Sequence, residues 1–225
     1  MGSQDLFHKR KAKLANNLER KKAKRDSYDK VLIVCEGEKT EPNYFKELID
    51  TYEINSANVA IDGSCGSSPK SVFERAVELY QAEKRKGDPF DKVFCVFDRD
   101  SHDSYEETLK RISLKNPKLT FFATNSIPCF EFWILLHFKY TTKPYVSTAT
   151  SSMCNEVLKE LSEVMPTYAK GNEKVFSSLL NQIEYAKSNA IRAEKESQKN
   201  NTDNPMTSVH ILIEYLQNIK SENKG

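Results

Sequence analysis

The stretch Val31-Leu-Ile-Val-Cys35-Glu36-Gly37 is an uninterrupted apolar run that stops at a carboxylate and a glycine. The run is short and rich in β-branched side chains, which is typical of a strand buried on both faces of a parallel sheet. A second such run, Lys92-Val-Phe-Cys-Val-Phe97, leads directly into Asp98-Arg99-Asp100. These stretches predict two central strands, each followed at once by acidic side chains.

Helical and strand patterns alternate around these two runs. We expect strands at about 31–35, 59–61, 92–97 and 119–123, with helices at about 40–52, 67–86, 103–115 and 128–138. This order predicts an α/β fold with a four-stranded parallel sheet flanked by helices. Further helices are expected at about 153–164, 172–198 and 206–220. We therefore divide the chain into a basic arm (1–29), an α/β domain (30–140) and a helical region (141–225) that packs on or beside it.

Composition excludes several classes of protein. The 225 residues are 38% apolar and 29% charged, as in ordinary globular proteins, and no apolar run approaches the 18 residues of a membrane span. The polar, basic beginning does not resemble a secretory signal. Five scattered cysteines without a Cys-x-x-Cys pair lead us to expect reduced thiols in a cytoplasmic protein.

Charge is uneven along the chain. Residues 1–30 contain ten Lys or Arg and four acidic residues, whereas the remainder carries a net charge of −4. Such a segment is either a solvated tail or an arm that binds the phosphates of a nucleic acid. Candidate phosphate contacts in it are Arg10, Lys11, Lys21 and Lys22.

The acidic residues after the two central strands form the main candidate site. Ligands of open parallel sheets bind beyond the carboxyl ends of the strands, where Glu36, Asp98 and Asp100 are expected. Asp98 and Asp100 are two residues apart and would point the same way from an extended chain. Oxygen donors without His or Cys favour one or two Mg²⁺ or Mn²⁺ ions, which suits phosphodiester hydrolysis. Acidic residues after strands are also common as helix caps.

Two further acids could join this site. Glu131 lies in the first turn of an otherwise apolar helix, and Glu41 lies in the first turn of the helix expected from residue 40. Each is a candidate metal ligand, and each could instead act only as a capping residue at a helix N-terminus. Gly37 would permit a tight turn and the close approach of a phosphate.

Several basic residues could contact substrate. Lys39 is a candidate catalytic residue and, with Arg99, could clamp a phosphate, although both could merely offset the acids by ion pairing. His102 is a candidate phosphate contact, and Lys170, near Tyr168, could contact nucleic acid or lie in a solvated loop. We expect His137 and Trp133 to be core residues.

Residues 31–45, 97–100, 126–138 and 204–210 resemble four motifs of the RloB-like family. That family looks like a member of the Toprim group, whose fold is a four-stranded parallel sheet with an acidic metal site, and it is similar to the nuclease branch of this group. The resemblance implies a Mg²⁺-dependent nuclease of bacterial anti-phage or abortive-infection defence, controlled by an RloA-type ATPase of the ABC/AAA class. It matches Glu36 to the Toprim glutamate, a general base or metal ligand, and matches Asp98 and Asp100 to the metal-binding pair.

Two functions lead the alternatives from the sequence, ahead of a phosphotransferase or primase-like enzyme. The first is an endonuclease acting on DNA or RNA. The alternative is a non-catalytic nucleic-acid-binding regulator or adaptor, in which the acids bind a structural cation or nothing.

The basic arm leads to a first prediction. If the arm binds phosphates, deleting residues 1–26 should weaken nucleic-acid binding. The slope of log Kd against the logarithm of the salt concentration should also decrease, by about 0.9 for each phosphate that the arm neutralises. Fluorescence anisotropy with a labelled oligonucleotide over a salt series measures both quantities. An unchanged affinity and slope would show that the arm does not bind nucleic acid.

Overall fold

The computed structural model describes residues 27–99, 102–115 and 119–221. Its elements, in chain order, are β1 (Val31–Cys35), α2 (Thr40–Thr51), β2 (Val59–Asp62), α3 (Pro69–Arg85), β3 (Lys92–Asp98), α4 (Tyr105–Leu114), β4 (Phe121–Ile127), α5 (Glu131–Leu135), α6 (Met153–Val164), α7 (Val175–Leu179), the 3₁₀ turn η1 (Leu180–Gln182), α8 (Ile183–Asn200), β5 (Met206–Thr207) and α9 (Val209–Asn218). The expected basic arm lies outside the described residues, except for its last three.

The sheet has five strands in the order β2-β1-β3-β4-β5. The first four are parallel, as predicted, and β5 is antiparallel to β4. The prediction of four strands is therefore wrong by one. The sequence could not predict β5, because a two-residue strand is too short to show a periodic pattern. β5 forms where Thr207 and Met206 pair with Ser126 and Ile127 at the end of β4.

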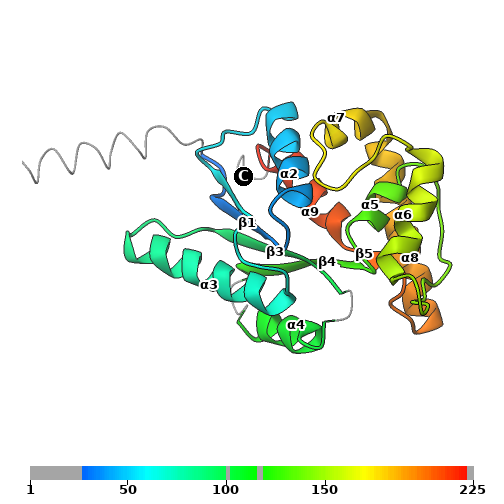
Figure 1. The fold of residues 1–225 in the computed structure, drawn as a ribbon. Helices are drawn as coiled ribbons and strands as arrows, with labels where there is room; N and C mark the ends of the chain where they lie inside the picture. Colours follow the sequence, from blue (N-terminus) through cyan, green and yellow to red (C-terminus); the bar gives the residue numbers. More distant parts are fainter. Residues whose placement is uncertain (1–26, 100–101, 116–118, 222–225) are drawn as a thin grey trace, which may run out of the picture.

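Helices cover both faces of the sheet. Figure 1 shows α3 and α4 on one side of the strands, with α2 and α9 on the other. β1 contributes to both cores, because Leu32 and Val34 pack with α3 whereas Val31, Ile33 and Cys35 pack with the opposite layer. This two-sided burial explains why the β1 sequence is continuously apolar rather than alternating.

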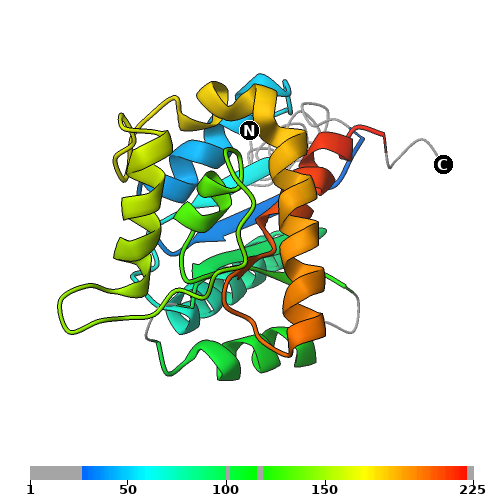
Figure 2. The same cartoon turned by 90° about the vertical axis from the view of Figure 1, so that its right-hand side faces the viewer.

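The C-terminal helices belong to the larger of these two cores. Val157 of α6, Phe176 of α7, Ala186 of α8 and Leu212 of α9 are buried in the same cluster as β1 and α2. α5 lies between α6 and α8 (Figure 2). Buried residues of the region after residue 140 therefore pack in the same core as β1 and α2.

Some element boundaries differ from those expected. β4 continues to Ile127 instead of ending near residue 123, because the polar side chains of Asn125 and Ser126 find partners in Tyr105 and Thr207. α5 spans five residues only, and the helix expected over 172–198 is divided into α7, η1 and α8. α9 begins at Val209 because β5 occupies the first positions of the expected helix.

The expected core residues Trp133 and His137 are fully buried in α5 and the turn after it. The indole Nε1 of Trp133 donates a hydrogen bond to the Tyr44 hydroxyl at 2.8 Å. His137 Nδ1 lies 3.1 Å from the Trp133 carbonyl oxygen, whereas its buried Nε2 has no hydrogen-bond partner among the described residues. Burial lowers the pKa of His137 from 6.5 to about 4, because the charged ring would lose its hydration.

This shifted pKa leads to a stability prediction. The unfolded chain takes up a proton at His137 near pH 6.5 and the folded chain only near pH 4, so the stability present above pH 6.5 is lost as the pH falls through this window. Between pH 7 and pH 5, the free energy of unfolding should fall by about 2 kcal/mol less in His137→Phe than in the wild type. Urea denaturation at both values measures the difference, and an equal pH dependence would refute the assignment.

Candidate functional site

The acidic site is built on the pairing of β1 with β3. The two strands are parallel neighbours, with Cys35 opposite Val96, so their carboxyl ends reach the same edge of the sheet. Glu36 N–H donates to the Val96 carbonyl at 3.0 Å, and Glu36 Oε2 accepts a hydrogen bond from Asp98 N–H at 2.9 Å. The structure therefore brings together two acids that are 62 positions apart in the sequence. Asp100, the third predicted acid, lies outside the described residues.

Glu41 and Glu131 approach the same edge. Burial raises the pKa of Asp98 well above its ordinary value, and the negative charges of Glu41, Glu131 and Glu36 raise it further. Burial also raises the pKa of Glu41 to about 7, with further contributions from Glu131 and Glu36. We call these four carboxylates the acidic cluster, because the negative charges of its members raise the pKa values of Glu41 and Asp98.

Gly37 makes room for one of these carboxylates. A Cβ atom at this position would lie only 2.6 Å from Glu41 Oε2, so any other residue would push the Glu41 side chain away. We expected Gly37 to allow a phosphate to approach the backbone. In the structure Gly37 lies against the end of the Glu41 side chain, and the approach of a phosphate to it stays a prediction.

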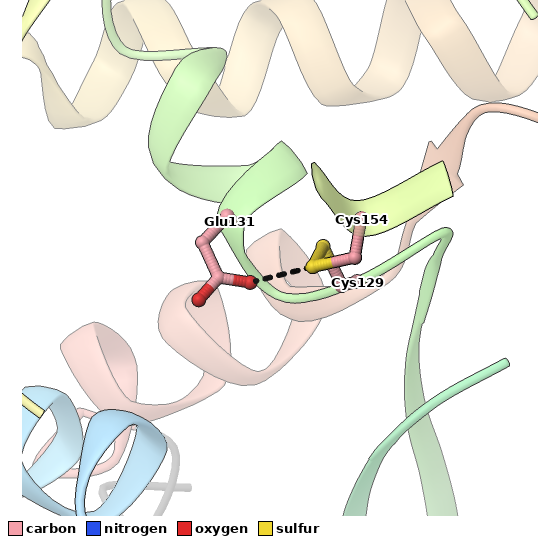
Figure 3. Close-up of side chains that lie close together, drawn as sticks. All are labelled: Cys129, Glu131 and Cys154. Atoms are coloured by element: carbon pink, nitrogen blue, oxygen red, sulfur yellow. Dashed lines mark hydrogen bonds between the residues drawn. A yellow bond between two sulfur atoms is a disulfide. The ribbon is translucent and has the colours of Figure 1, made fainter. Parts of the chain in front are cut away.

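Glu131 is the most enclosed member of the cluster, with a side chain that is 2% exposed. Tyr168 donates its hydroxyl proton to Glu131 Oε1 at 3.1 Å, and Lys170 Nζ lies 3.3 Å from the same oxygen. On the other side, Cys154 Sγ lies 3.5 Å from Oε2 (Figure 3). The C-terminal region therefore supplies one cation and one hydroxyl donor to the site.

The segment with Lys170 is anchored on the first turn of α2. Gly171 N–H donates to Thr40 Oγ1 at 3.0 Å, and Asn43 Nδ2 donates to the Gly171 carbonyl at 3.1 Å. Gly171 has a φ of +79°, and a Cβ atom there would lie 3.1 Å from Lys39 Cβ. A glycine thus allows this segment to lie directly against Lys39.

An open groove of about 490 Å³ lies beside the acidic cluster. Its lining includes Glu36, Gly37, Lys39, Ser67 and Lys170. Four of the residues predicted to act on or contact a substrate therefore share one groove, which is lined by two acids (Glu36 and Glu38) and two lysines. A phosphate in the groove would meet cations from both the start of α2 and the 168–171 segment.

The remaining predicted contact residues are placed differently. His102 Nε2 lies 3.4 Å from Glu36 Oε1, next to the cluster. Arg99 instead forms an ion pair with Asp203 and lies over the Tyr105 ring, so its guanidinium is already engaged by the C-terminal region. Arg10, Lys11, Lys21 and Lys22 lie outside the described residues.

The expectation of five reduced cysteines is wrong for two of them. Cys129 and Cys154 form a disulfide, with Cα atoms 5.7 Å apart (Figure 3). The two cysteines meet because α6 packs on α5. They are 25 positions apart in the sequence, and no local motif predicts this tertiary contact. Cys35, Cys65 and Cys95 are free.

The candidate metal ligands differ in how closely their donor atoms lie. Within the described residues, the one set of three or more whose donor atoms all lie within 4.8 Å of one another is Cys129, Glu131 and Cys154. Glu36, Glu41 and Asp98 form no set as close as this. Their carboxylates gather at one edge without forming a compact coordination shell.

Comparison with known proteins places the chain in a family. No helix of the described part is both long and apolar enough to cross a membrane. Searches of the curated proteins and of the solved structures gave no significant match. A family model described as RloB-like protein matches residues 31–216, which include every strand of the sheet and most of the C-terminal helices. The chain therefore belongs to the RloB-like protein family.

Proposed function

We propose that this protein is a Mg²⁺-dependent endonuclease that hydrolyses phosphodiester bonds of DNA or RNA. The observation that supports the proposal is the acidic cluster, in which Glu36, Glu41, Asp98 and Glu131 repel one another at the carboxyl edge of a parallel sheet. Such repulsion is offset either by bound protons or by a cation. The oxygen-only donor set is the one that Mg²⁺ and Mn²⁺ prefer.

A compact shell of carboxylates is not required for this ion. Mg²⁺ usually keeps several of its waters and binds through one or two carboxylates, so a cluster wider than a compact shell can hold it. Glu36 and Asp98 would be the main ligands, with Glu41 and Glu131 as further oxygen donors. When bound, the ion would polarise the phosphoryl oxygen and lower the pKa of a nearby water.

The chain's own residues would position the substrate. Lys39 and Lys170 line the groove and could hold a phosphate beside the acids. The Asp98 N–H group fixes the orientation of the Glu36 carboxylate, so a reacting group would meet a preorganised oxygen. Lys170 also offsets part of the negative charge of the cluster, because its charge lowers the pKa values of Glu41 and Asp98.

The wider biological role in this proposal comes from the family resemblance. In this role the protein would be a Toprim-type nuclease of cytoplasmic anti-phage defence, and an ABC/AAA-type ATPase would control its activity. A second candidate function is a non-catalytic nucleic-acid-binding regulator of the same complex. Measurements of cleavage and of ion binding separate it from the first.

The first experiment measures cleavage. The full chain, with and without a partner ATPase, should cut at least one of plasmid, single-stranded DNA or total RNA in Mg²⁺ or Mn²⁺. Asp98→Asn and Glu36→Gln should each lose at least about 100-fold in rate, because each removes a negative oxygen donor. Lys159→Gln, an exposed change on α6, is the matched control and should cut normally. Full activity in both acidic variants would refute the nuclease.

The second experiment measures binding of the ion without any substrate. A ligand that binds the folded state alone raises its stability, so Mg²⁺ at about 100 times its Kd should raise the wild-type Tm by roughly 5–10 °C. Asp98→Asn should lose most of this rise. In EDTA the same variant should be at least as stable as the wild type, because one of the mutually repelling charges is gone. An equal Mg²⁺ effect in both proteins would place the ion elsewhere.

A further inference from the structure

Cys129 and Cys154 form a disulfide beside a carboxylate of the acidic cluster (Figure 3). Cys129 precedes Glu131 by two residues, and Cys154 Sγ lies 3.5 Å from Glu131 Oε2 (Figure 3). Lys170 Nζ, which lies 3.3 Å from Glu131 Oε1, is also 3.6 Å from Cys154 Sγ. The Cys154 sulfur of this disulfide therefore lies against both Glu131, a candidate metal ligand, and Lys170, which forms an ion pair with Glu131.

We propose that Cys129 and Cys154 are a redox modification site, reversibly oxidised by low-molecular-weight disulfides such as oxidised glutathione. In the oxidised form, the disulfide links the turn that carries Glu131 covalently to the start of α6. In the reduced form this covalent link is absent, and the hydrogen bonding of Glu131 changes. The inference does not depend on nuclease activity, because the pair and its effect on the turn can be measured without substrate.

The exchange balances in two steps. The Cys154 thiol loses its proton and attacks oxidised glutathione, which gives a mixed disulfide on Cys154 and releases one reduced glutathione. The Cys129 thiol then loses its proton and attacks the Cys154 sulfur, which forms the internal disulfide and releases a second reduced glutathione. Two protein thiols are oxidised and one glutathione disulfide is reduced to two thiols.

Access favours Cys154 as the first sulfur to react. Cys129 is 1% exposed and Cys154 8%, and the lysine that lies against Cys154 has a side chain that is 53% exposed. The partly exposed Lys170 side chain therefore lies between the Cys154 sulfur and solvent. A neighbouring ammonium group also stabilises negative charge on a sulfur that attacks or leaves.

The other three cysteines are unsuited to this chemistry. Cys35 and Cys95 are fully buried on opposite faces of the sheet, so they cannot pair with each other. Cys65 donates its thiol proton to the Cys35 carbonyl at 3.0 Å, and burial raises its pKa to about 11. Cys65→Ala is therefore a suitable control, because it removes a thiol that should not take part.

Oxidation changes the surroundings of Glu131 in a definite way. A disulfide sulfur has no proton to donate, so in the oxidised protein the donors to Glu131 are Tyr168 and Lys170. After reduction, the Cys154 thiol can donate to Glu131 Oε2 as well. Reduction also opens a covalent loop that spans 25 positions and contains the whole of α5.

The test equilibrates the full chain in glutathione buffers that range from fully reduced to fully oxidised. Alkylation after denaturation should show the number of free thiols falling from five to three, with a disulfide-linked Cys129–Cys154 peptide in the mass spectrum. The change should reverse when reduced glutathione is restored. The Tm should rise by roughly 5–10 °C on oxidation, because the closed loop restricts the unfolded chain.

Variants and hydrogen exchange complete the test. Cys129→Ala and Cys154→Ala should lose the oxidation-dependent change in Tm, whereas Cys65→Ala should keep it. Amides of residues 131–136 should exchange about tenfold faster in the reduced protein than in the oxidised protein.

Four results would overturn the proposal. The pair could stay reduced in fully oxidised glutathione, or it could stay bonded in fully reduced glutathione as a purely structural disulfide does. Equal exchange rates in both forms would show no effect on the Glu131 turn. Binding of one Zn²⁺ by the reduced protein, lost in both cysteine variants and preventing disulfide formation, would make Cys129, Glu131 and Cys154 a metal site instead.

Discussion

The repulsion among carboxylates at one edge of the sheet is the constraint around which this structure is arranged. The parallel pairing of β1 with β3 fixes Glu36 beside Asp98, and the first turns of α2 and α5 add Glu41 and Glu131. Buried like charges are costly, so the surrounding chain must compensate for them. Lys170 and the backbone N–H of Asp98 supply part of that compensation. A divalent cation would supply the rest in the proposed function.

The C-terminal region is part of this arrangement. Its helices share the core of the sheet domain, and its 168–171 segment is held against α2 by the contacts of Gly171 with Thr40 and Asn43. Two of the groups that meet Glu131, the Tyr168 hydroxyl and the Lys170 ammonium, come from this segment. Truncation before it would therefore remove part of the site as well as part of the core.

The central sheet was predictable from the sequence because burial on both faces leaves a visible signature. The runs at 31–35 and 92–97 are continuously apolar, and both proved to be central strands. The end of β4 was not predictable, since Asn125 and Ser126 are polar and their partners lie 20 and 81 positions away. β5 is too short for any period to appear.

The site was predictable only in outline. An acid directly after each central strand indicated that Glu36 and Asp98 would meet, because carboxyl ends of parallel strands share an edge. The contacts of Glu131 with Tyr168, Lys170 and Cys154 arise from the packing of α6 and the following loop on α5. Nothing in the local sequence of these residues encodes that packing. The Cys129–Cys154 bond was missed for the same reason, because widely spaced cysteines are paired by tertiary structure.

If the acidic cluster holds the proposed divalent cation, a crystal soaked in Mn²⁺ should show it by anomalous diffraction. At least one Mn²⁺ peak should lie within coordination distance of a carboxylate oxygen of Glu36 or Asp98 and be absent from crystals of Asp98→Asn. A map with no peak at this edge of the sheet, or with a peak only at Cys129 and Cys154, would contradict this proposal.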